Sequence, residues 1–191
     1  CIRDRNNSGD TTNDIDVAAG ECRGTRGILD LVLTAALTGK RLDADWTAGA
    51  SAGMRYSGAA ITDTTYHLFL IGKPDGTVDL FAYAGGTDPT SVLPSGYVDY
   101  RMIGSIVRAT SILQFTQDGD YFRLTSPALD INAASQTTTS ASRSLVSAPS
   151  GIKTRVKANI SISSAPNDWA LYISSPAQTD SNPSNTAAPL A

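Results

Sequence analysis

Residues 65–84 (TYHLFLIGKPDGTVDLFAYA) encode a β-hairpin. Two apolar runs flank the tetrapeptide Lys73-Pro74-Asp75-Gly76. Proline presets φ at the first central position of a turn, aspartate can bond its own backbone, and glycine accepts a positive φ. The first of the two strands has apolar residues on both of its faces, which predicts a central strand that is covered on both sides.

Composition favours strands over helices. Charged residues make up 17% of the chain, below the globular average of about 25%. Glutamate occurs once, at Glu21, and lysine only four times, although both are strong helix formers. A chain of 191 residues can bury a core without metals or disulfides. The net charge of −3 provides no broad positive field for nucleic acid.

Other segments also have the length and pattern of strands. The clearest alternation, 152–163, places Ile152, Val156 and Ile160 on one face. Gly104 lies inside another strand, where glycine often marks a bulge or a close backbone approach. The predicted strands outside the hairpin are 28–36, 40–46, 54–61, 97–108, 112–115, 121–125, 152–163 and 169–174. Many short strands with turns between them predict an all-β fold, an antiparallel β-sandwich or jelly-roll-like domain.

The ends of the chain differ from its middle. Residues 1–27 contain no aromatic side chain, and residues 174–191 have no periodicity and three prolines. We therefore expect an extended N-terminal arm (1–27), a β domain (28–173) and a C-terminal arm (174–191). No apolar run approaches the roughly 20 residues of a membrane span. The first residue is Cys1 rather than methionine, which fits a processed or truncated piece of a longer protein.

The two cysteines, Cys1 and Cys22, allow two interpretations. A bridge between them would close a loop of about twenty residues and stabilise the fold by roughly 3 kcal/mol. Two free thiols are the alternative.

Three sets of polar residues could in principle support chemistry. His67, the only histidine, lies mid-strand and is interpreted as a packed structural residue. Residues 10–21 match the ligand spacing of a calcium loop but have Ile15 where the turn requires glycine, so a solvated acidic loop is favoured. Asp118 and Asp120 flank Gly119 and are better explained by a turn than as paired catalytic carboxylates. We expect no catalytic residue, metal site or cofactor.

Three cations on one face of the 152–163 strand are the best binding candidate. Lys153, Arg155 and Lys157 could contact a neighbouring subunit or an anionic ligand. Such a stripe is more often the wet face of an amphipathic strand, and both interpretations stay open. Asn159-Ile160-Ser161 matches a glycosylation sequon. Because the motif is short and falls in a predicted strand, we interpret it as a chance match.

Residues 41–122 resemble a module of tailed-bacteriophage virion proteins. The order and spacing of five segments carry the resemblance: KRLDADW at 40–46, TYHLFLI at 65–71, DGTVD at 75–79, YRMIGSI at 100–106 and FTQDGD at 115–120. The resemblance implies a non-enzymatic part of the virion and brings no catalytic residues with it.

The implied function is that of a tail-fibre or tail-tip protein that contributes to assembly or host-surface contact. One alternative is a capsid decoration or head-fibre protein, and a second is a tailspike-type polysaccharide-degrading enzyme. We expect a homo-oligomer, with a trimer favoured because subunits can cover each other's edge strands. The expected partners are other virion proteins and a host-surface glycan or protein.

Overall fold

The computed structural model describes residues 4–119, 121–126, 128–132, 141–161 and 173. The chain forms two compact units, residues 1–128 with 147–154 and residues 129–146 with 155–191. The described residues contain twelve strands, all in the first unit, and one short 3₁₀ turn (Thr90–Val92). The strands are β1 (Asp4–Asn6), β2 (Asp14–Val17), β3 (Gly20–Arg23), β4 (Asp30–Leu33), β5 (Leu37–Asp45), β6 (Gly53–Arg55), β7 (Thr65–Gly72), β8 (Val78–Tyr83), β9 (Asp99–Ala109), β10 (Ser111–Ile112), β11 (Phe115–Asp118) and β12 (Tyr121–Leu124).

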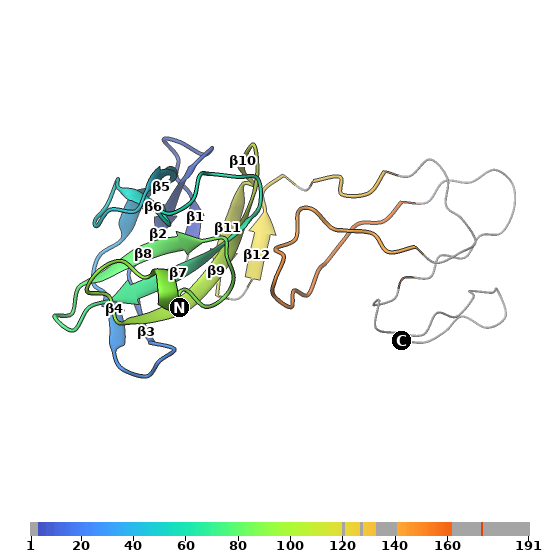
Figure 1. Ribbon diagram of the computed structural model, residues 1–191. Coiled ribbons are helices and arrows are strands. Elements are labelled where there is room, and N and C mark those ends of the chain that lie inside the picture. The colour runs from blue at the N-terminus through green and yellow to red at the C-terminus, as the bar shows by residue number, and fades with distance from the viewer. Residues whose placement is uncertain (1–3, 120, 127, 133–140, 162–172, 174–191) are drawn as a thin grey trace, which may run out of the picture. The chain divides into compact units, whose positions relative to one another are not determined.

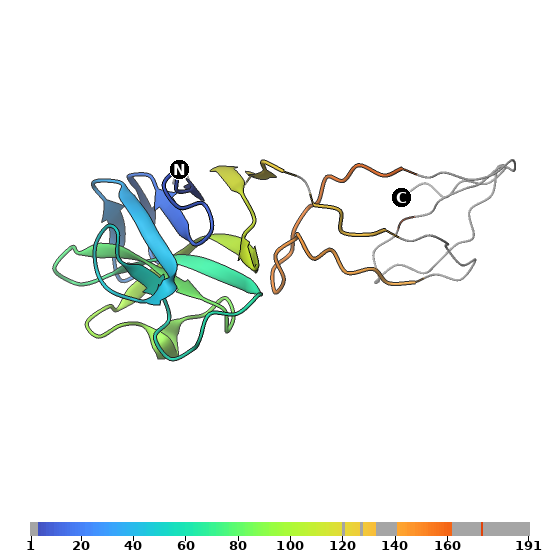
Figure 2. The ribbon, with the colours of Figure 1, turned by 90° about the horizontal axis from the view of Figure 1, so that it is seen from above.

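Ten of these strands form one curled sheet. Their order is β10-β9-β7-β8-β6-β5-β2-β1-β11-β12, and β3 pairs with β4 in a small second sheet. Figures 1 and 2 show β7, β8 and β9 crossing the middle of the first unit. The prediction of an all-β, sandwich-like domain is confirmed. The large sheet is mixed rather than purely antiparallel, because the short strand β6 runs parallel to both β5 and β8.

The central strand β7 is buried along its whole length, as predicted from its apolar residues. On one face, Leu68 and Leu70 belong to the larger hydrophobic core. On the other face, Phe69 and Ile71 pack in a second, largely aromatic core. Both cores use neighbouring positions of the same strand, since successive side chains point to opposite faces.

The predicted hairpin joins β7 to β8. Their pairing runs from His67 opposite Tyr83 to Gly72 opposite Val78. In the turn, the Asp75 carboxylate accepts a hydrogen bond from the Thr77 amide (2.9 Å), and Gly76 has φ of 87°. The prediction from turn chemistry is confirmed. The turn predicted around Gly119 also joins two paired strands, β11 and β12.

Gly104 lies where the sheet curls onto itself. Leu68 pairs with Gly104 but Phe69 pairs with Met102, so β9 carries one extra residue, a β-bulge. A Cβ at position 104 would lie 2.7 Å from Cζ of Phe122 on β12. Both predicted reasons for a glycine, a bulge and a close approach, therefore apply.

The prediction of an extended N-terminal arm is wrong for the described residues 4–27. Strands β1 and β2 are members of the large sheet, and Ile15 and Val17 are fully buried in the main core. Residues 24–29 are fixed by Asp99, whose carboxylate accepts hydrogen bonds from four backbone amides, those of Arg26, Ile28, Leu29 and Tyr100. Two apolar residues are enough to place the short polar strand β2 in the core, because the longer strand β5 pairs with it.

The predicted strand at 152–163 is also not formed over its described residues. Residues 152–161 have no regular secondary structure, and 153–161 are exposed at odd and even positions alike. Residues 147–154 instead belong to the first unit, where Ser150 donates hydrogen bonds to Oγ1 of Thr65. Apart from Ile173, the predicted strand 169–174 lies outside the described residues, as does the C-terminal arm.

Candidate functional site

The three cations of the predicted binding stripe do not share a strand face. Lys153, Arg155 and Lys157 are exposed, and the backbone that carries them is irregular. Lys153 belongs to the first compact unit, whereas the other two belong to the second. A binding role for these residues stays a prediction.

The carboxylates of the acidic N-terminal segment accept hydrogen bonds from nearby backbone and side-chain groups. The Asp10 carboxylate accepts a hydrogen bond from the Thr12 amide (2.7 Å), and Asp16 accepts from the side chain of Asn7 and the amide of Gly39. Burial, together with the charges of Asp10 and nearby acids, raises the pKa of Asp14 to about 6. Across the described part of the chain, no three metal-ligating side chains gather into a group that could hold an ion.

The remaining candidates from the sequence are placed as follows. Cys22 is half-buried with a free thiol, and its suggested partner Cys1 lies outside the described residues. Asp118 is the last residue of β11. Asp120, like Cys1, lies outside the described residues.

His67 is a buried residue of the central strand. It is 3% exposed, and its Nδ1 lies 2.8 Å from Oγ of Ser105 on β9. Burial lowers the pKa of the imidazole, which favours its neutral form. A packed residue, the role expected for His67, fits this environment.

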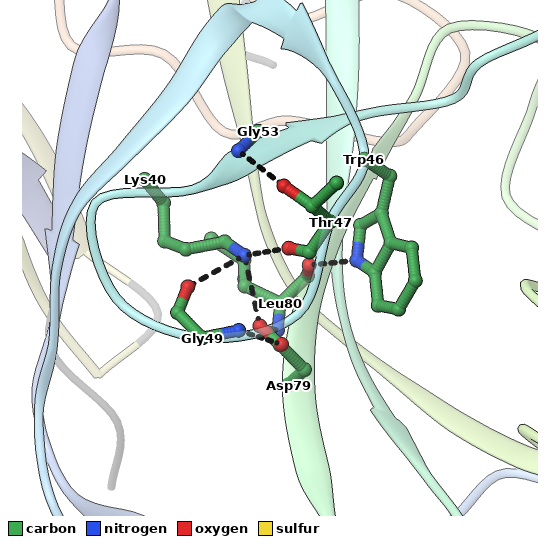
Figure 3. Close-up of polar contacts among 7 residues, drawn as sticks. All are labelled: Lys40, Trp46, Thr47, Gly49, Gly53, Asp79 and Leu80. Atoms are coloured by element: carbon green, nitrogen blue, oxygen red, sulfur yellow. Dashed lines mark hydrogen bonds and ion pairs between the residues drawn. The ribbon is translucent and has the colours of Figure 1, made fainter.

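The most tightly organised polar cluster is centred on Lys40 and Asp79, which sequence reasoning did not single out. Nζ of Lys40 lies 3.0 Å from Oδ1 of Asp79, and the two side chains are 0% and 3% exposed. The ammonium group also donates to the carbonyls of Thr47 (3.0 Å) and Gly49 (3.1 Å). Figure 3 shows these contacts converging on one nitrogen, so each of its three donors has a partner.

The cluster anchors the loop between β5 and β6 to strand β8. Asp79 accepts hydrogen bonds from the amides of Gly49 (2.7 Å) and Leu80 (2.6 Å). The indole of Trp46 donates to the carbonyl of Leu80 (2.9 Å). Burial lowers the pKa of Lys40, and the neighbouring carboxylate opposes that effect. The arrangement fixes a loop in place and stabilises the fold.

Alternation along the strands contains the signal for this pair. Lys40 shares its strand face with Leu42 and Ala44, the half-buried side of β5. Asp79 shares its face with Phe81, which is buried in the second core. A lysine and an aspartate that both fall on apolar faces predict a buried pair, because each charge is costly to bury alone.

A recess of about 410 Å³ lies where β1, β2, β5 and β11 meet. Its lining residues are Asp4, Arg5, Asp16, Val17, Ala18, Ala36, Thr38, Thr116 and Gln117. Asp4 and Gln117 are 1% and 6% exposed, whereas Thr38 and Thr116 are exposed. The recess therefore has a buried polar side at Asp4 and Gln117 and an exposed side that includes Thr38 and Thr116.

Two side chains of this recess have buried acceptor atoms without hydrogen-bond partners. These atoms are both carboxylate oxygens of Asp4 and Oε1 of Gln117. An unpaired buried polar atom is costly, so most are satisfied in folded proteins. Burial raises the pKa of Asp4 to about 7. A carboxyl group so displaced marks a site where protonation changes near neutral pH.

Comparisons with protein-family models, curated proteins and solved structures gave no match. Nor do the described residues include a helix of the length and apolarity needed to cross a membrane.

Proposed function

We propose that this chain is a structural protein of a tailed-bacteriophage particle, a tail-fibre or tail-tip component that serves assembly or host-surface contact. The resemblance over residues 41–122 carries the proposal. Four of its segments, 40–46, 65–71, 100–106 and 115–120, coincide largely with β5, β7, β9 and β11. The resemblance therefore lies in the framework of one sheet rather than in scattered loops.

The physical character of the domain supports this role. A central strand buried on both faces and a fully bonded ion pair between β5 and β8 favour a rigid unit. Particle components need such durability, since they must persist without repair. The proposed localisation is the virion, and the proposed partners are other virion proteins.

The edges of the large sheet are the proposed contacts between subunits. Strands β10 and β12 end the strand order, so each pairs on one side within this sheet. On β12, Tyr121 is 83% exposed. Open edges favour pairing with another chain, and a homo-oligomer, with a trimer favoured, would cover them.

Immunogold labelling of intact phage particles tests the proposal. An antibody raised against the full chain should label the tail or its fibres, and antibody pre-absorbed with the purified chain is the control. Label on the head would instead support the capsid-decoration alternative. If neither tail nor head is labelled and the protein is found only in the lysate, both the tail proposal and the capsid-decoration alternative are refuted.

A further inference from the structure

The seam between β1 and β11 joins segments more than a hundred residues apart in the chain. Arg5 is opposite Thr116 in an antiparallel register. Asn6 accepts a hydrogen bond from the Phe115 amide (2.7 Å) through its side-chain oxygen. This register places Asp4 beside Gln117, and cross-strand neighbours point to the same face of a sheet.

The orientation of the Gln117 amide is fixed by its nitrogen. Nε2 donates to the carbonyls of Ile103 (2.9 Å) and Gly119 (2.8 Å). Oε1 must therefore be the atom left as an acceptor, and it is buried without a partner. The neighbouring Asp4 contributes two further buried acceptors and no donor when it is ionised. One proton shared between the two side chains would remove this conflict.

We propose that Asp4 is held as a neutral carboxylic acid that donates a hydrogen bond to Oε1 of Gln117, forming a latch that opens when the acid loses its proton. Ionisation would place an unpaired buried charge beside an acceptor oxygen, which is strongly unfavourable. The β1–β11 seam would loosen, and with it the attachment of the β11–β12 hairpin to the sheet.

Among the described residues, no cation forms an ion pair with Asp4. The charged side chains on β1 and on the strands nearest to it are Arg5, Asp14, Asp16, Lys40, Arg41, Asp43, Asp45, Asp118 and Arg123. Lys40 is bonded to Asp79, and Arg5 lies 3.6 Å from Asp16. Arg5 and Asp16, which also line the recess, are cross-strand partners, and Arg5 is paired with Asp16 rather than with Asp4. Burial is the cause of the raised pKa of Asp4, to about 7.

The sign of the pH effect follows from this displacement. A carboxyl group whose pKa is raised on folding stabilises the folded state most at low pH, and that contribution is lost as pH rises. Between the ordinary value of 3.8 and about 7, the closed seam holds one more proton than the open one. The opening constant should therefore rise about tenfold per pH unit across this window and level off above it.

Two measurements on the full chain test the latch. The ¹³C resonance of the Asp4 carboxyl group reports its titration directly. Hydrogen-exchange protection of the Phe115 amide, which donates across the seam, reports opening once the intrinsic pH dependence of exchange is removed. The Leu70 amide in β7 is the internal reference, and Asp30→Asn, at an exposed aspartate on β4, is the matched control variant.

The expected result is an Asp4 titration midpoint near pH 7 and Phe115 protection that falls about tenfold per pH unit between pH 5 and 7. Asp4→Asn should abolish that dependence, because its amide donates to Gln117 at every pH, whereas Asp30→Asn should retain it. The comparison isolates Asp4 from Asp14, whose pKa is also raised. An Asp4 midpoint below pH 5, or the same pH dependence in Asp4→Asn, would overturn the proposal. The carboxyl titration decides the matter even if that variant does not fold.

Discussion

Replacing Lys40 with methionine should destabilise the protein severely, although the two side chains have similar length. The substitution removes a charge that is 0% exposed and leaves the Asp79 carboxylate buried without its cation. It also removes the donor to the carbonyls of Thr47 and Gly49. The Gly49 and Leu80 amides still bond Asp79, so its charge is not left wholly unsolvated.

The expected cost is about 3–5 kcal/mol, the range for breaking a buried pair by removing one partner. Neutralising Asp79 as well should recover part of the lost stability. In Lys40→Met/Asp79→Asn, the asparagine oxygen can still accept from an amide while the isolated charge is gone. We therefore expect the double variant to be at least 1 kcal/mol more stable than the single one, an energetic coupling between neighbouring residues.

Urea unfolding followed by tryptophan fluorescence measures these differences, since Trp46 contacts the same cluster through Leu80. With a slope of about 2 kcal/mol per molar urea, a loss of 4 kcal/mol moves the midpoint by about 2 M. Lys153→Met is the matched control: it makes the same change at an exposed lysine and should shift stability by less than about 0.5 kcal/mol.

A loss below about 1 kcal/mol in Lys40→Met would refute this reasoning, because the ion pair would then contribute no more than an exposed one. The same holds if the double variant is no more stable than the single one.

Three further outcomes are expected. Asp99→Asn should cost about 3 kcal/mol in urea unfolding, because one of two oxygens that each accept two backbone amides is lost. Burial alone would raise the pKa of Asp99, but the four amides outweigh burial and lower it. The free energy of unfolding that the ionised Asp99 contributes should therefore be lost in acid titrations as pH falls below the ordinary value of 3.8. Gly104→Ala should cost about 1–3 kcal/mol, since its Cβ would crowd an aromatic ring of β12. In thermal melts, unchanged stability is expected for the triple serine variant of the exposed cations Lys153, Arg155 and Lys157.

Much of the framework was predictable because its signals are local. The turn at Asp75-Gly76 depends on backbone constraints that neighbouring residues set. A glycine inside a strand pattern is a local mark of a bulge or a close approach, although the ring that approaches Gly104, that of Phe122, comes from a different strand. The two faces of β7 follow from alternation alone. The buried position of Lys40 was also predictable, because Lys40 lies two residues from Leu42 and therefore on the same face of β5.

Which alternating segments become strands was decided by the tertiary structure. Residues 14–17 have only two apolar positions, yet they pair with β5 and enter the core. Residues 152–161 alternate far more regularly, yet their backbone is irregular and 153–161 are exposed. Alternation gives a segment one apolar face, but a strand also needs a neighbour for its backbone hydrogen bonds. The seam that brings Asp4 beside Gln117 depends on the same rule, because long-range pairing is chosen by the assembled sheet and not by either segment alone.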